Sequence, residues 1–205
     1  MKAWPISYLA VVPILVALLT ACQSVEDLYS LGGSNKLVPP CPAVKFSKDM
    51  DKITVFKTGS GQDITDIIYE AELTASTGEC EYISDNNVYT SVVLTLQVDM
   101  DVTSGPAANT RPTQLNYFVA IPEFFPEGWY LQPAEMVKGY KSAKLLVTLP
   151  PKGKTIGLVD DPIYIRIPLN EHRSGPQTTV IMGFVLSKDQ LEFNQQQGAG
   201  IRLGG

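Results

Sequence analysis

The sequence predicts an all-β fold, an antiparallel β-sandwich that ends in a short helix. From Cys41 onward, apolar and polar residues alternate with a period of two, which is typical of half-buried strands. Clusters of glycine, proline, asparagine and aspartate interrupt this alternation at short intervals. Because 44% of the 205 residues are apolar, the chain can bury a full core. No pattern of helices alternating with strands is present, which supports an antiparallel sandwich. A closed β-barrel is the main alternative to the sandwich.

The clearest predicted strand covers 88–101, where valines and leucines alternate with polar residues over a length sufficient to bend across two sheets. The full set of predicted strands is 43–46, 53–56, 67–74, 79–83, 88–101, 115–121, 145–149, 163–167 and 180–186. Turn residues at 59–61, 85–87, 104–106, 150–153, 160–162 and 174–176 separate them. The arrangement resembles an immunoglobulin-like or fibronectin-III-like sandwich, and it matches no such family residue by residue.

The end of the chain carries the one good helix signal. Ser187 followed three residues later by Gln190 has the form of a capping box, which predicts a short helix that includes 191–194. The segment 195–205 has no core-forming pattern, and we expect it to be disordered.

The first residues of the chain define its expected destination. Lys2 precedes an apolar run of about 12 residues that ends at Leu19, a length within the roughly 7–15 of a signal-peptide core. A spanning helix needs roughly 20 residues. Leu19, Thr20, Ala21 and Cys22 follow in the register of a lipobox, so the segment resembles the signal peptide of a bacterial lipoprotein. An ordinary secretory signal or an N-terminal membrane anchor is the alternative.

The resemblance implies that 1–21 is removed and that Cys22 carries diacylglycerol and an acylated amino group. Gln23 follows the cysteine in place of the aspartate that favours inner-membrane retention in enteric bacteria, so the expected location is the outer membrane, facing the periplasm. The predicted organisation continues with a flexible tether over 22–40, the sandwich domain over 41–194 and the tail. A short helix over 25–31 is the alternative within the tether.

The net charge of the chain limits the classes of partner that it is expected to bind. The formal net charge is −5 and the pI is near 4.9, which argues against nucleic acid and against docking on anionic lipid through basic patches. The lipid on Cys22 is therefore the expected membrane attachment, and an envelope protein is the expected partner.

Two cysteines remain once Cys22 is assigned to the lipid. Cys41 and Cys80 form an even pair in an oxidising compartment, which predicts a structural disulfide. Two buried free thiols or a redox pair are the alternatives, although the Cys-x-x-Cys spacing of redox pairs is absent.

No catalytic constellation stands out in the sequence. The single histidine, His172, lies in a polar turn, and the chain has no Gly-x-Ser-x-Gly motif. We therefore expect no enzyme, no cofactor and no zinc site. A calcium site is a weaker possibility, because three pairs of aspartates could supply carboxylate ligands. The pairs are Asp49 with Asp51, Asp99 with Asp101, and Asp160 with Asp161.

The most unusual stretch is 121–133, which contains four aromatic residues and three prolines between two strands. The aromatic residues are Phe124, Phe125, Trp129 and Tyr130. One interpretation is a crossing connection that packs over an open end of the sandwich, and the other is a stiff surface that contacts a partner. The sequence as a whole predicts a non-enzymatic envelope lipoprotein that binds or positions another protein. The alternatives are a lipoprotein that binds a small ligand or a metal, and an enzyme.

Overall fold

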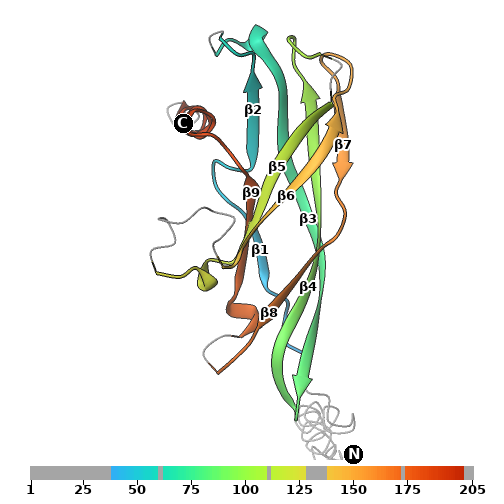
Figure 1. Cartoon of the computed structure of the whole chain (residues 1–205), viewed down its shortest axis with the longest axis vertical. Coiled ribbons are helices and arrows are strands. Elements are labelled where there is room, and N and C mark those ends of the chain that lie inside the picture. Colours follow the sequence, from blue (N-terminus) through green and yellow to red (C-terminus); the bar gives the residue numbers. More distant parts are fainter. Residues whose placement is uncertain (1–37, 60–61, 110–111, 128–137, 172–173, 201–205) are drawn as a thin grey trace, which may run out of the picture. The chain divides into compact units, whose positions relative to one another are not determined.

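The computed structural model describes residues 38–59, 62–109, 112–127, 138–171 and 174–200, and it confirms an all-β sandwich with a C-terminal helix. Two sheets face each other without closing into a barrel (Figure 1). The predicted signal peptide and lipobox, and the tether up to residue 37, lie outside the described residues.

Sheet A has four strands in the order β1-β9-β5-β6. Sheet B has the order β2-β3-β4-β7, and β8 also pairs with β4. The strands are β1 (Ala43–Phe46), β2 (Lys52–Phe56), β3 (Ile67–Asp85), β4 (Val88–Ser104), β5 (Pro112–Ala120), β6 (Tyr140–Thr148), β7 (Thr155–Val159), β8 (Ile163–Pro168) and β9 (Thr179–Phe184). All the strand pairs are antiparallel except β1 with β9, which is parallel.

The alternation in β4 produces the core as predicted, since one face of the strand is buried from Val92 to Ser104. The fully buried side chains of the core include Tyr117, Phe184, Leu94, Leu96, Met100, Leu115, Ile167, Met182, Val92, Val98, Val102 and Val180. They come from both sheets, so the core lies between them.

Three expectations about the strands were wrong in detail. The strand predicted at 88–101 does not bend across two sheets, because it stays paired with β3 throughout, and β7 and β8 pair with its two halves. The segments 67–74 and 79–83 belong to the single strand β3, with irregular register near Leu73 and Ile83. Strand β7 was not predicted, because Gly157 at its centre interrupts the alternation.

The predicted turn between β3 and β4 is confirmed. Asn86 and Asn87 have φ angles of +46° and +63°, the left-handed conformation that a two-residue hairpin turn requires and that asparagine tolerates.

The capping box is confirmed at helix α3 (Lys188–Gly200). The Ser187 N–H donates to Oε1 of Gln190 at 2.8 Å, and the Gln190 N–H donates to Oγ of Ser187 at 3.2 Å. The helix continues to residue 200, so the expectation of disorder was wrong for 195–200. Helix α3 lies against β2, where Asn194 Nδ2 donates to the carbonyl oxygens of Asp49 and Lys52 at 2.9 and 2.8 Å.

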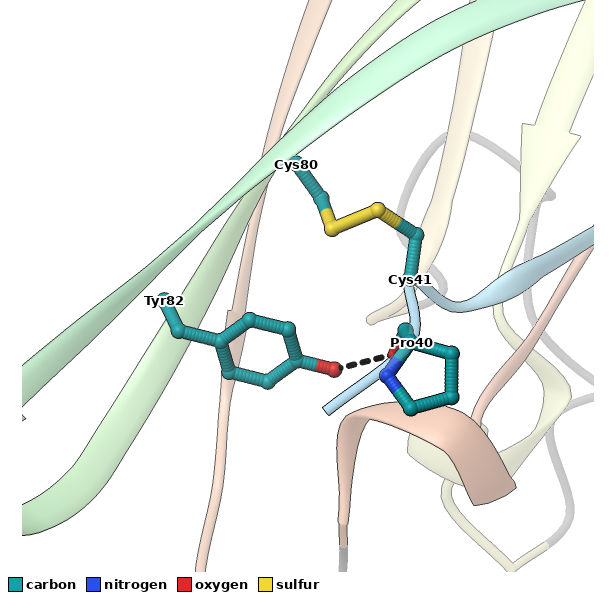
Figure 2. The surroundings of a disulfide bond; sticks show 4 residues. All are labelled: Pro40, Cys41, Cys80 and Tyr82. Atoms are coloured by element: carbon teal, nitrogen blue, oxygen red, sulfur yellow. Dashed lines mark hydrogen bonds between the residues drawn. A yellow bond between two sulfur atoms is a disulfide. The ribbon is translucent and has the colours of Figure 1, made fainter. Parts of the chain in front are cut away.

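The predicted disulfide is also confirmed. Cys41 is bonded to Cys80 near the middle of β3, with 5.7 Å between their Cα atoms. Beside it, the Tyr82 hydroxyl donates a 2.7 Å hydrogen bond to the carbonyl oxygen of Pro40 (Figure 2). The Tyr82 ring lies so close to Gly175 that a Cβ at that glycine would overlap the hydroxyl oxygen. These contacts fix the start of the domain to sheet B.

Candidate binding groove on the open side of the sandwich

Strands β6 and β8 are edge strands of opposite sheets, and a groove lies between them. Two neighbouring cavities of about 310 and 370 Å³ form it, and both are lined by Val119, Lys141 and Tyr164. Strand β6 pairs only with β5, and β8 pairs only with β4, among the described strands. The groove is therefore the unclosed side of the sandwich.

One end of the groove is basic. Lys138, Lys141 and Arg166 line it, and no carboxylate is among the described residues there. Lys141 lies opposite Val119 in the β5–β6 register, and Val119 faces the core. The Lys141 side chain therefore belongs to the inward face of β6, and it reaches solvent because the sandwich is open there. Arg166 is held from β8, where its Nε donates to Oγ of Ser91 at 3.2 Å.

Aromatic rings accompany these cations. Phe124, Tyr140 and Tyr164 also line the basic end. The Lys138 ammonium lies 5.8 Å from the centre of the Phe124 ring, at the outer limit of a cation–π contact. Tyr164 is 68% exposed. The groove therefore combines positive charge with accessible apolar surface.

The other end of the groove contains the carboxylate of Asp160, which accepts two hydrogen bonds from the protein itself. The Tyr117 hydroxyl donates to Oδ2 of Asp160 at 2.5 Å, and Oδ1 of Asp160 accepts the Asp161 N–H at 2.8 Å. Burial and the negative charge of Asp160 raise the pKa of Tyr117 far above its usual value of 10.0. Lys144 lines this end together with the two aspartates, so charge is mixed here.

The aromatic loop begins and ends at the groove. Its neck is closed by the Ile121 N–H, which donates to the Gly139 carbonyl at 2.7 Å. Gly139 has a φ of +87°, and a Cβ there would lie 2.7 Å from Phe124 Cβ and 2.8 Å from the Ile121 carbonyl oxygen. The Glu123 side chain accepts the backbone N–H of Thr179 at 3.0 Å, which ties the loop to β9.

The predicted contact residues divide into two groups. Phe124 is half-buried, packs against the core and lines the groove, and Phe125 is half-buried beside it. Trp129 and Tyr130 lie outside the described residues. The structure thus places Phe124 in the lining of the groove.

The other predicted chemical sites lie apart from the groove or outside the described part. Asp99 and Asp101 are on β4, and Asp49 lies before β2 with a φ of +63°. His172 lies outside the described residues. Within the described ranges, no group of three metal-ligating side chains is close enough together to hold an ion. The same part of the chain contains no helix with the length and apolar character needed to cross a bilayer.

A larger cavity, of about 510 Å³, lies where α3 packs near β2. Its walls include Phe56 and Phe193, whose rings meet edge to face with centroids 5.2 Å apart. Asp49, Asp51 and Glu70 also line it. The sequence did not indicate this cavity, because it depends on the return of the last helix to the second strand.

The cations of the groove were also missed. Lys138 and Lys141 read as ordinary exposed residues around a strand, and Arg166 alternates with isoleucines on another. These three side chains line one groove only because the edge strands β6 and β8 are neighbours in the fold.

Comparison with known proteins finds no matching family model, no similar curated protein and no similar solved structure.

Proposed function

We propose that this chain is a non-enzymatic, lipid-anchored protein of the bacterial cell envelope whose sandwich domain binds or positions another envelope protein. In this proposal Cys22 carries the lipid, and the domain faces the periplasm from the outer membrane. The observation that carries the proposal is the Cys41–Cys80 disulfide.

The disulfide supports export of the chain. Structural disulfides form and persist in oxidising compartments such as the periplasm, and they are rare in the cytosol. The bond occupies both cysteines of the domain, which leaves Cys22 at the end of the lipobox as the third and last cysteine. This division of the cysteines is consistent with an exported lipoprotein.

The groove supports the binding role. Recognition surfaces combine accessible aromatic rings with charged groups that select the partner, and both occur between β6 and β8. The aromatic loop that starts at this groove adds Phe124 to its lining.

Binding of a small ligand is the second candidate function, and the cavity beside α3 favours it. Its volume of about 510 Å³ is within the range of roughly 300–1,000 Å³ typical of ligand sites, and two phenylalanines line it.

The anchor is tested by expressing the full chain and its Cys22→Ser variant in a bacterium with lipoprotein processing enzymes. We expect labelled palmitate in the wild type and none in the variant, and we expect the wild type alone in the outer-membrane fraction. The Gln23→Asp variant is the matched control, which should stay lipidated and move to the inner membrane. Palmitate on Cys22→Ser at the wild-type level would exclude the anchor.

The binding role is tested by crosslinking intact cells and identifying proteins recovered with the wild-type chain. Variants Phe124→Ala, Phe125→Ala, Trp129→Ala and Tyr130→Ala follow, each with its melting temperature. At least one should lose the partner while the domain stays folded if the aromatic loop makes the contact. Recovery of no protein from any envelope fraction would contradict the role.

A further inference from the structure

We infer that the basic end of the groove binds an extended, acidic peptide segment of the partner protein, which pairs as an added strand with the free edge of β6. This inference rests on the proposed binding function and names the chemistry of the partner.

The first step is the free edge. Strand β6 pairs with β5 along its whole length, from Tyr140 opposite Ala120 to Thr148 opposite Pro112. No other described strand pairs with β6, and the strand contains no proline. An edge strand directs about half of its backbone N–H and C=O groups away from the sheet, where an extended peptide can pair with them.

The second step is the charge of the occupant. Lys138, Lys141 and Arg166 come from the end of the aromatic loop, from β6 and from β8, so three separate segments bring positive charge to one place. The chain as a whole has 16 basic and 21 acidic residues, which makes a basic end without a carboxylate unusual for this molecule. Such a site favours carboxylates over neutral or basic groups.

The third step is the apolar part of the occupant. Leu146 lies on the outward face of β6 and is 73% exposed, and Tyr164 is exposed on β8. Side chains of an added strand lie beside those of the strand it joins, and aromatic or β-branched residues make the best cross-strand pairs. The occupant is therefore acidic and alternates with apolar residues.

Lysine on an edge strand also has a simpler use, because it discourages pairing between identical edges. That use accounts for Lys141 and Lys144 on β6. It does not account for Arg166 on the opposite sheet or for Lys138 in the connection before β6, which also line the basic end of the groove. All three cations together favour attraction of an acidic strand.

The experiment uses the full chain in detergent and a fluorescent peptide of the length of β6 in which glutamate and valine alternate. Anisotropy measures its binding to the wild type and to the double variant Lys141→Glu/Arg166→Glu. We expect the double variant to weaken binding at least tenfold. Lys152→Glu, in the turn before β7, is the control, which should bind within twofold of the wild type. Thermal melting of each variant verifies the fold.

Two altered peptides separate charge from strand pairing. Replacing glutamate with glutamine should weaken binding at least fivefold. N-methylation of alternate residues blocks one edge of the peptide. A peptide methylated at its odd-numbered residues and one methylated at its even-numbered residues are blocked on opposite edges, so one of them should lose binding while the other retains it.

Equal binding to the double variant and the wild type would overturn the inference, as would no binding of the acidic peptide at 1 mM. Self-association of the double variant with unchanged peptide binding would assign the lysines to edge protection and would also overturn it. In each of these cases, recovery of an envelope partner from crosslinked cells would leave the proposed function standing.

Discussion

The hydroxyl of Tyr117 joins the two sheets, because it extends from β5 in sheet A and donates to Oδ2 of Asp160, the residue that follows β7 of sheet B. The tyrosine is fully buried, yet its hydroxyl reaches the wall of the groove. The contact therefore links the packing of the core to the shape of the candidate site.

Replacing Tyr117 with phenylalanine removes this link and keeps the ring. We expect a loss of about 1.5–3 kcal/mol in the free energy of unfolding, the usual range for a hydrogen bond to a charged group. Urea denaturation of the variant and the wild type measures it. Asp160→Asn is the complementary change, because its single amide oxygen can accept from Tyr117 or from the Asp161 N–H but not from both, so it should also destabilise the domain. An unchanged free energy of unfolding in Tyr117→Phe would contradict the role of this bond.

The raised pKa of Tyr117 predicts a loss of stability in alkali. In the unfolded chain the phenol loses its proton near pH 10, whereas in the folded chain burial and Asp160 keep it protonated to higher pH. Above about pH 10 the unfolded state therefore binds fewer protons, so the free energy of unfolding falls as pH rises.

Chemical denaturation between pH 8 and 11 tests this slope. Tyr117→Phe should reduce it but not remove it, because burial also raises the pKa of Tyr69. An unchanged slope in the variant would show that Tyr117 ionises as easily in the folded chain as in the unfolded one.

Gly139→Ala should open the neck of the aromatic loop. The new Cβ would collide with Phe124 and with the Ile121 carbonyl, at a φ that side chains rarely adopt. We expect a stability loss of about 1–3 kcal/mol, from strain of this kind, and faster hydrogen exchange of the Ile121 amide. Gly153→Ala is the control, since Gly153 also has a positive φ but a Cβ there meets no atom within 4 Å. A similar loss in both variants would attribute the effect to backbone conformation alone.

Removing the disulfide should destabilise the domain by about 4 kcal/mol, because Cys41 and Cys80 close a loop with a sequence separation of 39. The double variant Cys41→Ser/Cys80→Ser avoids a lone reactive thiol, and thermal unfolding measures the loss. Intact mass after alkylation of the unreduced wild type checks the bond itself. Two alkylated thiols at positions 41 and 80 would mean that the pair is free.

The sequence predicted the sandwich because burial of one strand face leaves a period of two, and in β4 this pattern extends from Val92 to Val102. It also predicted the helix start, because a capping box is a local signal. The helix end could not be predicted, since α3 contacts β2 through Phe193 and Asn194 and this contact is tertiary.

The groove was beyond the reach of sequence for a similar reason. Alternation shows which face of β6 or β8 points inward, but it carries no information about which edges meet. Lys141 and Arg166 become neighbours only through that meeting of edges.

The position of the disulfide decides how the domain would respond to tension. A pull on the chain at Pro40 is transferred at Cys41 through the sulfur atoms to Cys80, and so bypasses the four-residue strand β1. Cys80 lies opposite Leu94 within the longest strand pair of the sandwich, so tension would enter the domain through β3 and not through β1. If the chain is anchored at Cys22 as proposed, a pull from the membrane would therefore reach sheet B without first separating β1 from β9.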